Sequence, residues 1–262
     1  MENRLTRLFA KKNENLLNVY FTAGFPELES TGIILRTLEK AGADIVEIGM
    51  PYSDPMADGP TIQQSNTVAL KNGMSIRQLF TQLESVQVDL PIILMGYLNP
   101  VMQYGIEKFC AEAARVGVDG LILPDLPLHD FEEIYRPIFE QYNLSIIFLV
   151  TPQTSEERIR RIDNLTNSFI YLVSSASTTG NKVGGDEKQI KYFERIKNMQ
   201  LRNPKLIGFG ISDHDSFALA CRYAEGAIIG SAFIKKIQEA NNLENNIEQF
   251  IQEIKASEAI TG

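Results

Sequence analysis

The chain has few of the residues that mark metal, disulfide or nucleic-acid chemistry. It contains two cysteines and two histidines among 262 residues, and its net charge is −8. Cys110 and Cys221 lie in apolar, helix-like contexts without metal or disulfide spacing, so we expect reduced core residues. His129 and His214 lack a neighbouring carboxylate cluster and are interpreted as polar residues at helix starts. The acidic balance and the lack of a basic stripe argue against a nucleic-acid partner.

Targeting and membrane segments are a second expected absence. Residues 1–12 carry charges throughout and contain no apolar run, so neither a signal peptide nor a transmembrane segment is expected. We therefore expect a cytoplasmic protein with no membrane partner. The length and the 44% hydrophobic content suit one large domain over residues 1–262, because no linker or low-complexity segment divides the chain.

Apolar runs alternate regularly with amphipathic stretches along the chain. Near-continuous apolar runs are typical of parallel strands that are buried on both faces. Eight such strands are predicted, over 18–22, 45–49, 92–96, 120–123, 145–150, 169–174, 206–208 and 226–229. Helical patterns between them include 31–41, 106–116, 131–142 and 156–165. Eight strand–helix units predict an α/β fold, the (β/α)8 TIM barrel, and a doubly wound open sheet is the alternative.

Three segments are additional to the eight strand–helix units. Leu5, Leu8 and Phe9 form an apolar stripe on an extra N-terminal helix, which we expect to plug the bottom of the barrel. The segment 62–88 holds more than one helix, so the second strand–helix unit is elongated. A final amphipathic helix is predicted over 243–256.

Chemistry in such a barrel is expected at the carboxyl ends of the strands. Lys205 precedes its strand and Lys182 lies in a loop, so no lysine ends a strand and a Schiff-base mechanism is disfavoured. Glu47 lies inside the second strand, and alternation places Val46 and Ile48 on the opposite face, toward the helices. Glu47 should then point into the barrel mouth, where desolvation raises its pKa toward the range useful for proton transfer. The alternative is a structural glutamate that bonds to a neighbouring strand.

Two further acids follow strands. Asp58 lies in a loop rich in proline and glycine, and its pattern fits a cap of the following helix as well as it fits catalysis. Asp125 lies between two prolines after the fourth strand and is interpreted as structural. Carboxylates therefore remain the candidates for acid–base chemistry.

Two glycine–serine turns predict a phosphate site. They lie at 210–212 and 230–232, where strands seven and eight pass into helices, although each turn alone would suit an ordinary helix cap. The loop 175–185, rich in serine, threonine and glycine, is interpreted as a mobile lid or else a long surface loop. From the residues alone, the chain is a metal-free barrel enzyme that moves protons on a small phosphorylated compound.

The segment 47–60, which reads EIGMPYSDPMADGP, closely resembles the signature of the tryptophan synthase alpha subunit family. The match continues in order through 21–26, 95–100, 178–180, 208–212 and 230–232. The resemblance implies a lyase of L-tryptophan biosynthesis that cleaves indole-3-glycerol phosphate to indole and glyceraldehyde 3-phosphate. This retro-aldol reaction needs protonation of indole C3, removal of a hydroxyl proton from the glycerol chain, and stabilisation of charge at the indole nitrogen.

The same resemblance assigns roles to residues. It implies Glu47 as the general acid/base and Asp58 as the partner of the indole N–H. It implies that substrate is lined by Tyr20, Met95, Tyr97, Ile122, Tyr171, Thr179, Gly180, Phe209, Gly210, Gly230 and Ser231. The chain departs from the family at Ser177, where the lid usually carries glycine, and at Tyr52, where the family usually has phenylalanine.

The family works as a complex, and the resemblance implies a tryptophan synthase beta subunit as partner in an alpha2beta2 heterotetramer. The implied contact surface comprises Pro51, Asp54, Asn99 and Pro100. Pyridoxal phosphate belongs to the beta subunit, so no cofactor and no metal are expected in this chain. A stand-alone indole-releasing lyase of the same family is one alternative. A non-catalytic activating subunit is another, and the presence of both implied catalytic acids argues against it.

Overall fold

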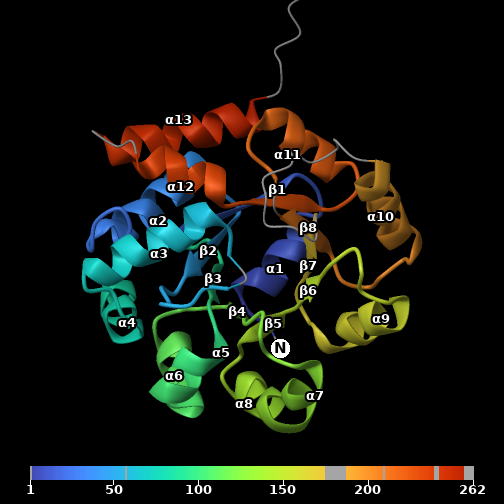
Figure 1. The fold of residues 1–262 in the computed structure, drawn as a ribbon, viewed down its shortest axis with the longest axis horizontal. Helices are drawn as coiled ribbons and strands as arrows, with labels where there is room; N and C mark the ends of the chain where they lie inside the picture. Colours follow the sequence, from blue (N-terminus) through green and yellow to red (C-terminus); the bar gives the residue numbers. More distant parts are fainter. Residues whose placement is uncertain (1, 57, 175–186, 209, 239–241, 257–262) are drawn as a thin grey trace, which may run out of the picture.

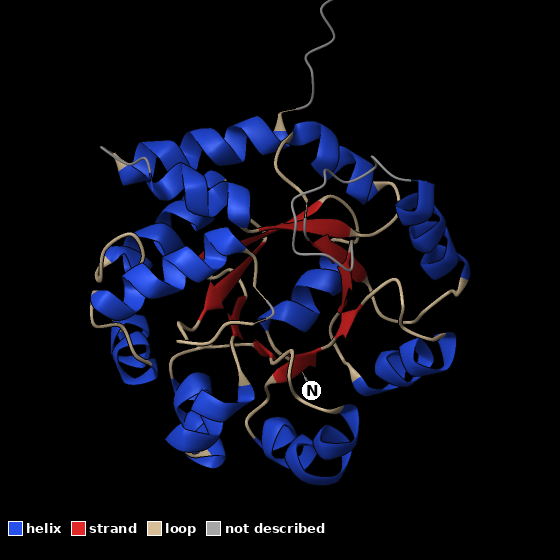
Figure 2. Cartoon of the chain, viewed as in Figure 1, coloured by secondary structure: helices blue, strands red, loops and turns tan. Residues whose placement is uncertain are grey.

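Parallel strands form a ring with a helix at its centre, and further helices surround the ring (Figures 1 and 2). The computed structural model describes residues 2–56, 58–174, 187–208, 210–238 and 242–256. Its strands are β1 (Leu16–Thr22), β2 (Ile45–Gly49), β3 (Ile92–Met95), β4 (Gly120–Ile122), β5 (Ser145–Ile147), β6 (Leu149–Val150), β7 (Ile170–Val173), β8 (Lys205–Gly208) and β9 (Gly226–Ile229). They pair in the order β5-β4-β3-β2-β1-β9-β8-β7-β6, and every pair is parallel. The predicted (β/α)8 barrel is confirmed.

The predicted fifth strand, 145–150, differs from the observed one because it is divided. β5 pairs with β4, whereas β6 pairs with β7, so the segment changes its hydrogen-bond partner at Phe148. The carbonyl of Phe148 accepts from the amide of Tyr171 at 3.0 Å. This bond marks the point where the pairing changes from β4 to β7. The two ends of the strand order are therefore consecutive in sequence, and the chain itself closes the ring.

The outer helices agree with the amphipathic patterns. They are α2 (Ser30–Ala41), α3 (Pro60–Lys71), α4 (Ile76–Glu84), α5 (Leu98–Tyr104), α6 (Ile106–Arg115), α7 (Leu128–Asp130), α8 (Arg136–Gln141), α9 (Glu156–Leu165), α10 (Glu187–Asn198), α11 (His214–Cys221), α12 (Ser231–Gln238) and α13 (Leu243–Lys255). The predicted helix 131–142 begins instead as a π-helix, η1 (Phe131–Tyr135), and continues as α8. Both α3 and α4 lie after β2, which confirms the elongated second unit.

Along most strands the side chains alternate between two apolar clusters. Leu17, Val46 and Ile48 belong to the cluster between strands and helices, whereas Leu16 and Ile45 belong to the cluster inside the ring. Continuous burial on both faces explains why the strand sequences are apolar at consecutive positions. The few polar side chains that point inward are therefore the ones to examine for chemistry.

The N-terminal helix α1 (Arg4–Lys11) lies within the ring of strands, as Figure 2 shows. Leu5 is fully buried in the inner cluster, and Leu8 and Phe9 pack against it. The Phe9 ring lies 5.7 Å from the ring of Phe169. Asn3 caps α1 by accepting from the amide of Thr6 at 3.0 Å. The predicted plug is confirmed, and it leaves the opposite end of the barrel for the site.

The cysteines and histidines follow the sequence predictions with one difference. Both thiols are free, and Cys110 is buried, but Cys221 is only half-buried. His214 begins α11, where its Nδ1 lies 2.9 Å from the carbonyl oxygen of Ile254, and His129 lies in α7. Within the described ranges, no group of three or more histidine, cysteine, aspartate or glutamate residues could hold a metal. No helix there is long and apolar enough to span a membrane.

Candidate active site

Glu47 lies in the middle of β2 and points into the barrel. Its neighbours Val46 and Ile48 pack in the outer cluster, as strand alternation predicts, and only 1% of Glu47 is exposed. The side-chain nitrogen Nδ2 of Asn18, on β1, donates to Glu47 Oε2 at 3.0 Å. A carboxylate so deeply buried is costly unless it is compensated, and one amide donor compensates it only in part.

Burial raises the pKa of Glu47 to about 8. The hydrogen bond from Asn18 lowers that pKa, and the charge of Asp58 raises it further. At pH 7 the side chain is then mostly a neutral acid that can donate a proton. Because its pKa is close to neutral pH, the side chain can also lose that proton at small energetic cost.

Asp58 lies in the loop between β2 and α3. Its backbone is fixed by two hydrogen bonds, from its amide to Pro55 O at 3.0 Å and from Gln63 Nε2 to its carbonyl at 2.8 Å. The interpretation of its side chain as a helix cap is wrong, because the N-cap of α3 is Gly59 and no side chain caps it. The carboxylate instead accepts a long hydrogen bond from the Tyr97 hydroxyl, at 3.4 Å.

Burial also raises the pKa of Asp58, to about 6, and the bond from Tyr97 lowers it. The two carboxyl groups therefore titrate on either side of neutral pH. Both also raise the pKa values of Tyr20 and Tyr171, although burial is the largest cause for each phenol. The four side chains thus interact through one poorly solvated space at the barrel mouth.

Two glycines make room for the tyrosines of this space. A Cβ on Gly49 would overlap the Tyr20 hydroxyl, and a Cβ on Gly208 would overlap the Tyr171 hydroxyl. Both glycines are the last residues of their strands. The phenols can therefore lie flat against the strand ends, where a larger residue would push them into the mouth.

Apolar side chains surround the acids. Tyr171 and Ile122 belong to the inner cluster, and Met95 packs against it. The register aligns Gly49 with Met95 and Met95 with Ile122, so these positions lie at one level of the barrel. The Tyr97 ring lies 5.2 Å from that of Tyr52. An aromatic and aliphatic surface of this kind suits a flat apolar ring that carries one polar edge.

The predicted phosphate residues lie at the ends of β8 and β9. Gly210 has a φ of +76°, which glycine adopts at little cost. Gly230 precedes α12, whose first residue, Ser231, is exposed. The first amides of a helix have no intrahelical acceptor and attract anions. Ser212 is less suited as a donor because its hydroxyl already donates to Asp213, at 3.2 Å.

Part of the predicted site lies outside the described residues. Thr179, Gly180 and Phe209 are in this group, as is the predicted lid 175–185 with Ser177. The described residues of the predicted substrate lining all lie at the carboxyl ends of strands or in the segments that follow, apart from Tyr20 and Tyr171 within β1 and β7.

Asp125 and Lys205 have structural roles. Both carboxylate oxygens of Asp125 accept from the amide of Leu98, at 2.9 and 3.1 Å, and so fix the start of α5. Lys205 begins β8, at the opposite end from the mouth, and its Nζ lies 3.0 Å from Glu225. The interpretation of Asp125 as structural is confirmed.

Sequence reasoning missed two polar contacts near the mouth. Asn18 is fully buried in the apolar strand β1, and it is the residue that contacts Glu47. Thr22 and Ser65 share a hydrogen bond of 2.6 Å that ties the end of β1 to α3. The signal for Asn18 was available, because an amide inside an apolar strand is as unusual as the carboxylate of Glu47.

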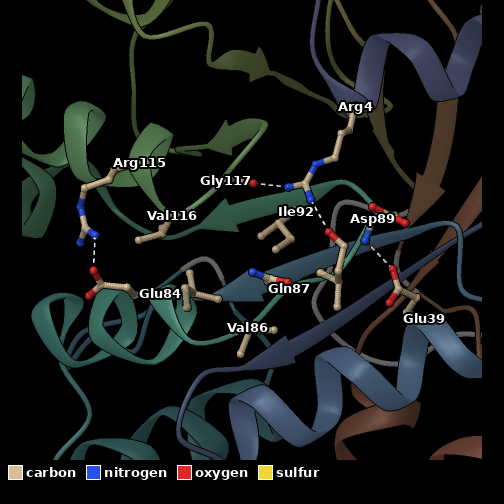
Figure 3. A pocket seen from close by; sticks show the side chains of 12 residues that line it. Arg4, Glu39, Glu84, Val86, Gln87, Asp89, Ile92, Arg115, Val116 and Gly117 are labelled. Atoms are coloured by element: carbon tan, nitrogen blue, oxygen red, sulfur yellow. Dashed lines mark hydrogen bonds and ion pairs between the residues drawn. The ribbon is translucent and has the colours of Figure 1, made fainter.

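A separate groove of about 590 Å³ opens beside the amino ends of β3 and β4 (Figure 3). Both arginines that line it already have partners: Arg115 contacts Glu84 at 2.7 Å, and Arg4 donates to the carbonyl of Val88 at 2.6 Å. Because both arginines are already paired and the groove is lined by neither Glu47 nor Asp58, this groove is not the candidate active site.

One buried and one partly buried carboxyl group at the mouth of a (β/α)8 barrel, beside aromatic side chains, define a barrel enzyme of the acid–base class. The family model described as tryptophan synthase alpha chain matches residues 7–261. This chain belongs to the tryptophan synthase alpha chain family.

Individual relatives cover nearly the whole chain. The tryptophan synthase alpha chain of Christiangramia forsetii is 53% identical over 248 residues, which cover 94% of this chain and 96% of the relative. The crystal structure of tryptophan synthase subunit alpha from Legionella pneumophila superposes with a TM-score of 0.86 at 30% identity and covers 97% of both chains. A chain in the structure of the tryptophan synthase complex from Pyrococcus furiosus gives a TM-score of 0.83 at 34% identity, covering 93% of this chain and 98% of that one.

Proposed function

We propose that this chain is the alpha subunit of a tryptophan synthase and that it cleaves indole-3-glycerol phosphate to indole and glyceraldehyde 3-phosphate. The observation that carries the proposal is the pair of acids at one barrel mouth, Glu47 buried and Asp58 partly buried, with a pKa of about 8 for Glu47 and about 6 for Asp58. Between these values Glu47 is a neutral acid while Asp58 is a carboxylate. Because their surroundings give the two carboxyl groups different pKa values, one can act as an acid while the other acts as a negative charge.

In the first step, neutral Glu47 donates its proton to C3 of the indole ring. The ring then carries a positive charge, which is shared with the indole nitrogen. The Asp58 carboxylate accepts a hydrogen bond from that N–H and stabilises the charge as it forms. Interactions that strengthen only as charge develops raise kcat more than they change substrate binding.

In the second step, Glu47 is a carboxylate and removes the proton from the hydroxyl on the carbon attached to C3. The oxygen forms the carbonyl of glyceraldehyde 3-phosphate as the carbon–carbon bond breaks. The bonding electron pair returns to the ring and neutralises its charge. Glu47 ends the cycle protonated, so the proton donated in the first step is restored.

The remaining predicted residues hold the substrate in this proposal. The indole ring lies among Tyr20, Met95, Tyr97, Ile122 and Tyr171. The phosphate binds at Gly210, Gly230, Ser231 and the first amides of α12. Thr179, Gly180 and Phe209 complete the set from outside the described residues.

The chain functions with a beta subunit in this proposal, in an alpha2beta2 heterotetramer. Pyridoxal phosphate belongs to that partner, and the alpha chain binds no cofactor of its own. Pro51, Asp54, Asn99 and Pro100 form the contact surface. Large apolar side chains beside these residues support it, because 86% of Met56 and 54% of Met102 are exposed. We place the complex in the cytoplasm.

An indole-release assay tests the proposal. Purified chain is incubated with indole-3-glycerol phosphate, alone and with increasing amounts of a tryptophan synthase beta subunit. We expect indole formation that rises on addition of the beta subunit and saturates at one beta chain per alpha chain. Equal turnover without the partner would instead identify a stand-alone lyase. No indole under either condition, from folded protein that binds its partner, would leave only a non-catalytic activating subunit.

A further inference from the structure

Asn18 lies directly below Glu47 in the interior of the barrel. It is fully buried on β1, and its neighbours in sequence, Leu17 and Val19, face the outer cluster. The register pairs Tyr20 with Glu47, so Asn18 is displaced from Glu47 toward the amino end of the barrel. It reaches the carboxyl group from the side that faces away from the mouth.

The amide of Asn18 has one described partner. Nδ2 donates to Glu47 Oε2 at 3.0 Å, while the other side-chain atom, Oδ1, is buried and accepts no hydrogen bond from any described residue. An unpaired buried amide oxygen costs about 1–3 kcal/mol. The fold alone therefore does not explain this residue, because a leucine of similar shape would satisfy the apolar interior without that cost.

We propose that Asn18 is a positioning residue for Glu47, one that holds the carboxyl group toward the substrate in both of its protonation states. This inference deepens the proposed function and rests on the assignment of Glu47 as the general acid/base. Asn18 itself exchanges no proton with the substrate.

The amide suits both states because its two ends differ. In the observed arrangement Nδ2 donates to Glu47 Oε2, a bond that lowers the pKa of Glu47 and so favours the ionised carboxylate. Rotation of the amide by about 180° would place Oδ1 where Nδ2 now lies, and Oδ1 could then accept from the protonated acid. The observed arrangement favours the ionised carboxylate, because Asn18 lowers the pKa of Glu47, and the rotated arrangement would keep the amide in contact with the neutral acid. Glu47 must pass through both states in each turnover, and a group that favoured only one would slow the other step.

The charged and titratable groups around Glu47 determine how a substitution of Asn18 should change the pKa of Glu47. Asp58, Tyr20 and Tyr171 interact with Glu47 electrostatically, and Asn18 is the group that lowers the pKa of Glu47. Removal of the amide should therefore raise that pKa and free the side chain to leave its productive orientation.

The first test replaces Asn18 by leucine in the full chain complexed with a beta subunit. We expect Asn18→Leu to lower kcat by about 10- to 100-fold, since small misplacement of a reacting group has effects of this size. KM should stay within about twofold. The alkaline limb of the pH profile of kcat/KM should move up by about one pH unit. Leu5→Val in the barrel floor is the control, because it perturbs the same interior without contact to the acids and should leave both quantities unchanged.

Asn18→Asp is the second variant and remains informative if the leucine variant fails to fold. A protonated aspartic acid at this position can share one proton with Glu47, whereas two carboxylates would repel each other. Relative to wild type at the same pH, Asn18→Asp should recover activity as the pH falls from 8 to 6. Activity of Asn18→Asp that is independent of pH would overturn the proposal.

A direct titration separates failure of this inference from failure of the proposed function. The carboxyl carbon of Glu47 is followed by 13C NMR against pH in the wild-type chain and in the leucine variant, and needs no turnover. We expect the midpoint to rise in Asn18→Leu. An unmoved midpoint, or a wild-type kcat in this variant, would overturn the positioning role even if wild-type enzyme releases indole. If the midpoint rises in Asn18→Leu but the wild-type chain releases no indole, the contact between Asn18 and Glu47 is retained and the proposed function is rejected.

Discussion

The two ends of the barrel hold acids of the same kind in opposite surroundings. At the amino end, Asp119 accepts from the amide of Ile92 at 2.9 Å and pairs with Arg4 at 2.8 Å. Asp44 likewise accepts from the amide of Leu17 at 2.9 Å and pairs with Lys12 at 2.6 Å. Each of these carboxylates bridges a strand to its neighbour and has a cation beside it.

At the carboxyl end, the acids have far fewer compensating partners. Glu47 accepts from an amide, Asp58 accepts one long bond from a phenol, and neither forms an ion pair among the described residues. Burial without a cation raises the pKa of both groups. The amino-end acids therefore stabilise the barrel, whereas the carboxyl-end acids are held in a state that favours proton exchange.

Glu47→Gln should give the largest change at the carboxyl end. The amide keeps the shape but can neither donate the proton to C3 nor accept one, so kcat should fall by about 10³-fold or more. Substrate should still bind, because the aromatic side chains near the acids and the predicted phosphate residues are intact. Steady-state kinetics and calorimetric titration with substrate would measure the two effects. Full activity in this variant would remove Glu47 from the mechanism.

Asp58→Asn should lower kcat by about 10²- to 10³-fold with a small change in KM, because its charge acts mainly in the transition state. Asp125→Asn is the matched control at the same end of the barrel: it keeps an acceptor for the amide of Leu98 and should retain most of the turnover. If Asp58→Asn instead kept its kcat and raised KM, the carboxylate would act only in ground-state binding.

Asp119→Ala should have the reverse profile. It leaves the Arg4 guanidinium and the Ile92 amide without their shared acceptor, and the loss of one partner from a buried pair costs about 3–5 kcal/mol of unfolding free energy. Turnover per folded molecule should be unchanged. Urea unfolding of the variant, combined with assays below the transition, would measure both. A large loss of kcat in fully folded Asp119→Ala would break the division between the two ends.

The pH dependence of stability gives a smaller effect that also distinguishes the acids at the two ends of the barrel. The folded-state pKa of Glu47 lies above its unfolded value, so folded protein binds the extra proton between about 4.5 and about 8. Its contribution is fully present below pH 4.5 and is lost as pH rises through 8. Between pH 5 and 8, wild type should lose about 3 kcal/mol more of its unfolding free energy than Glu47→Gln does. Urea titrations of the two proteins at a series of pH values would measure this difference. If burial does not raise the pKa of Glu47, the unfolding free energies of both proteins should change equally with pH.

The sequence predicts the parts of this molecule that depend on periodicity. Strand positions follow from near-continuous apolar runs, because both faces of each strand are buried. The inward direction of Glu47 follows from alternation within its strand. The division of the fifth strand at Phe148 does not follow from it, since both halves are equally apolar and differ only in the strand that each one pairs with.

Contacts between distant residues explain the remaining differences in the site. Asp58 and Asp125 both lie beside prolines in loops, yet one meets the hydroxyl of Tyr97 and the other meets the amide of Leu98. These partners lie 39 and 27 positions away along the chain, so local pattern cannot separate the two acids. Asn18 shows that the strand pattern also holds information about the site, because an amide in a fully buried strand marks a polar contact.

The anchoring of α1 has a consequence for synthesis on the ribosome. The Asn3 side chain donates to the carbonyls of Asp119 and Asn143 and to the hydroxyl of Ser145, partners that are translated 116 to 142 positions later. At the usual elongation rates of about 5–20 residues per second, roughly 6 to 30 seconds pass before those partners exist. During that interval the apolar stripe of α1 has no barrel to enter. Helix α1 is translated before its partners and therefore docks late, and nascent chains that end before Ser145 should expose it to protease or to a chaperone.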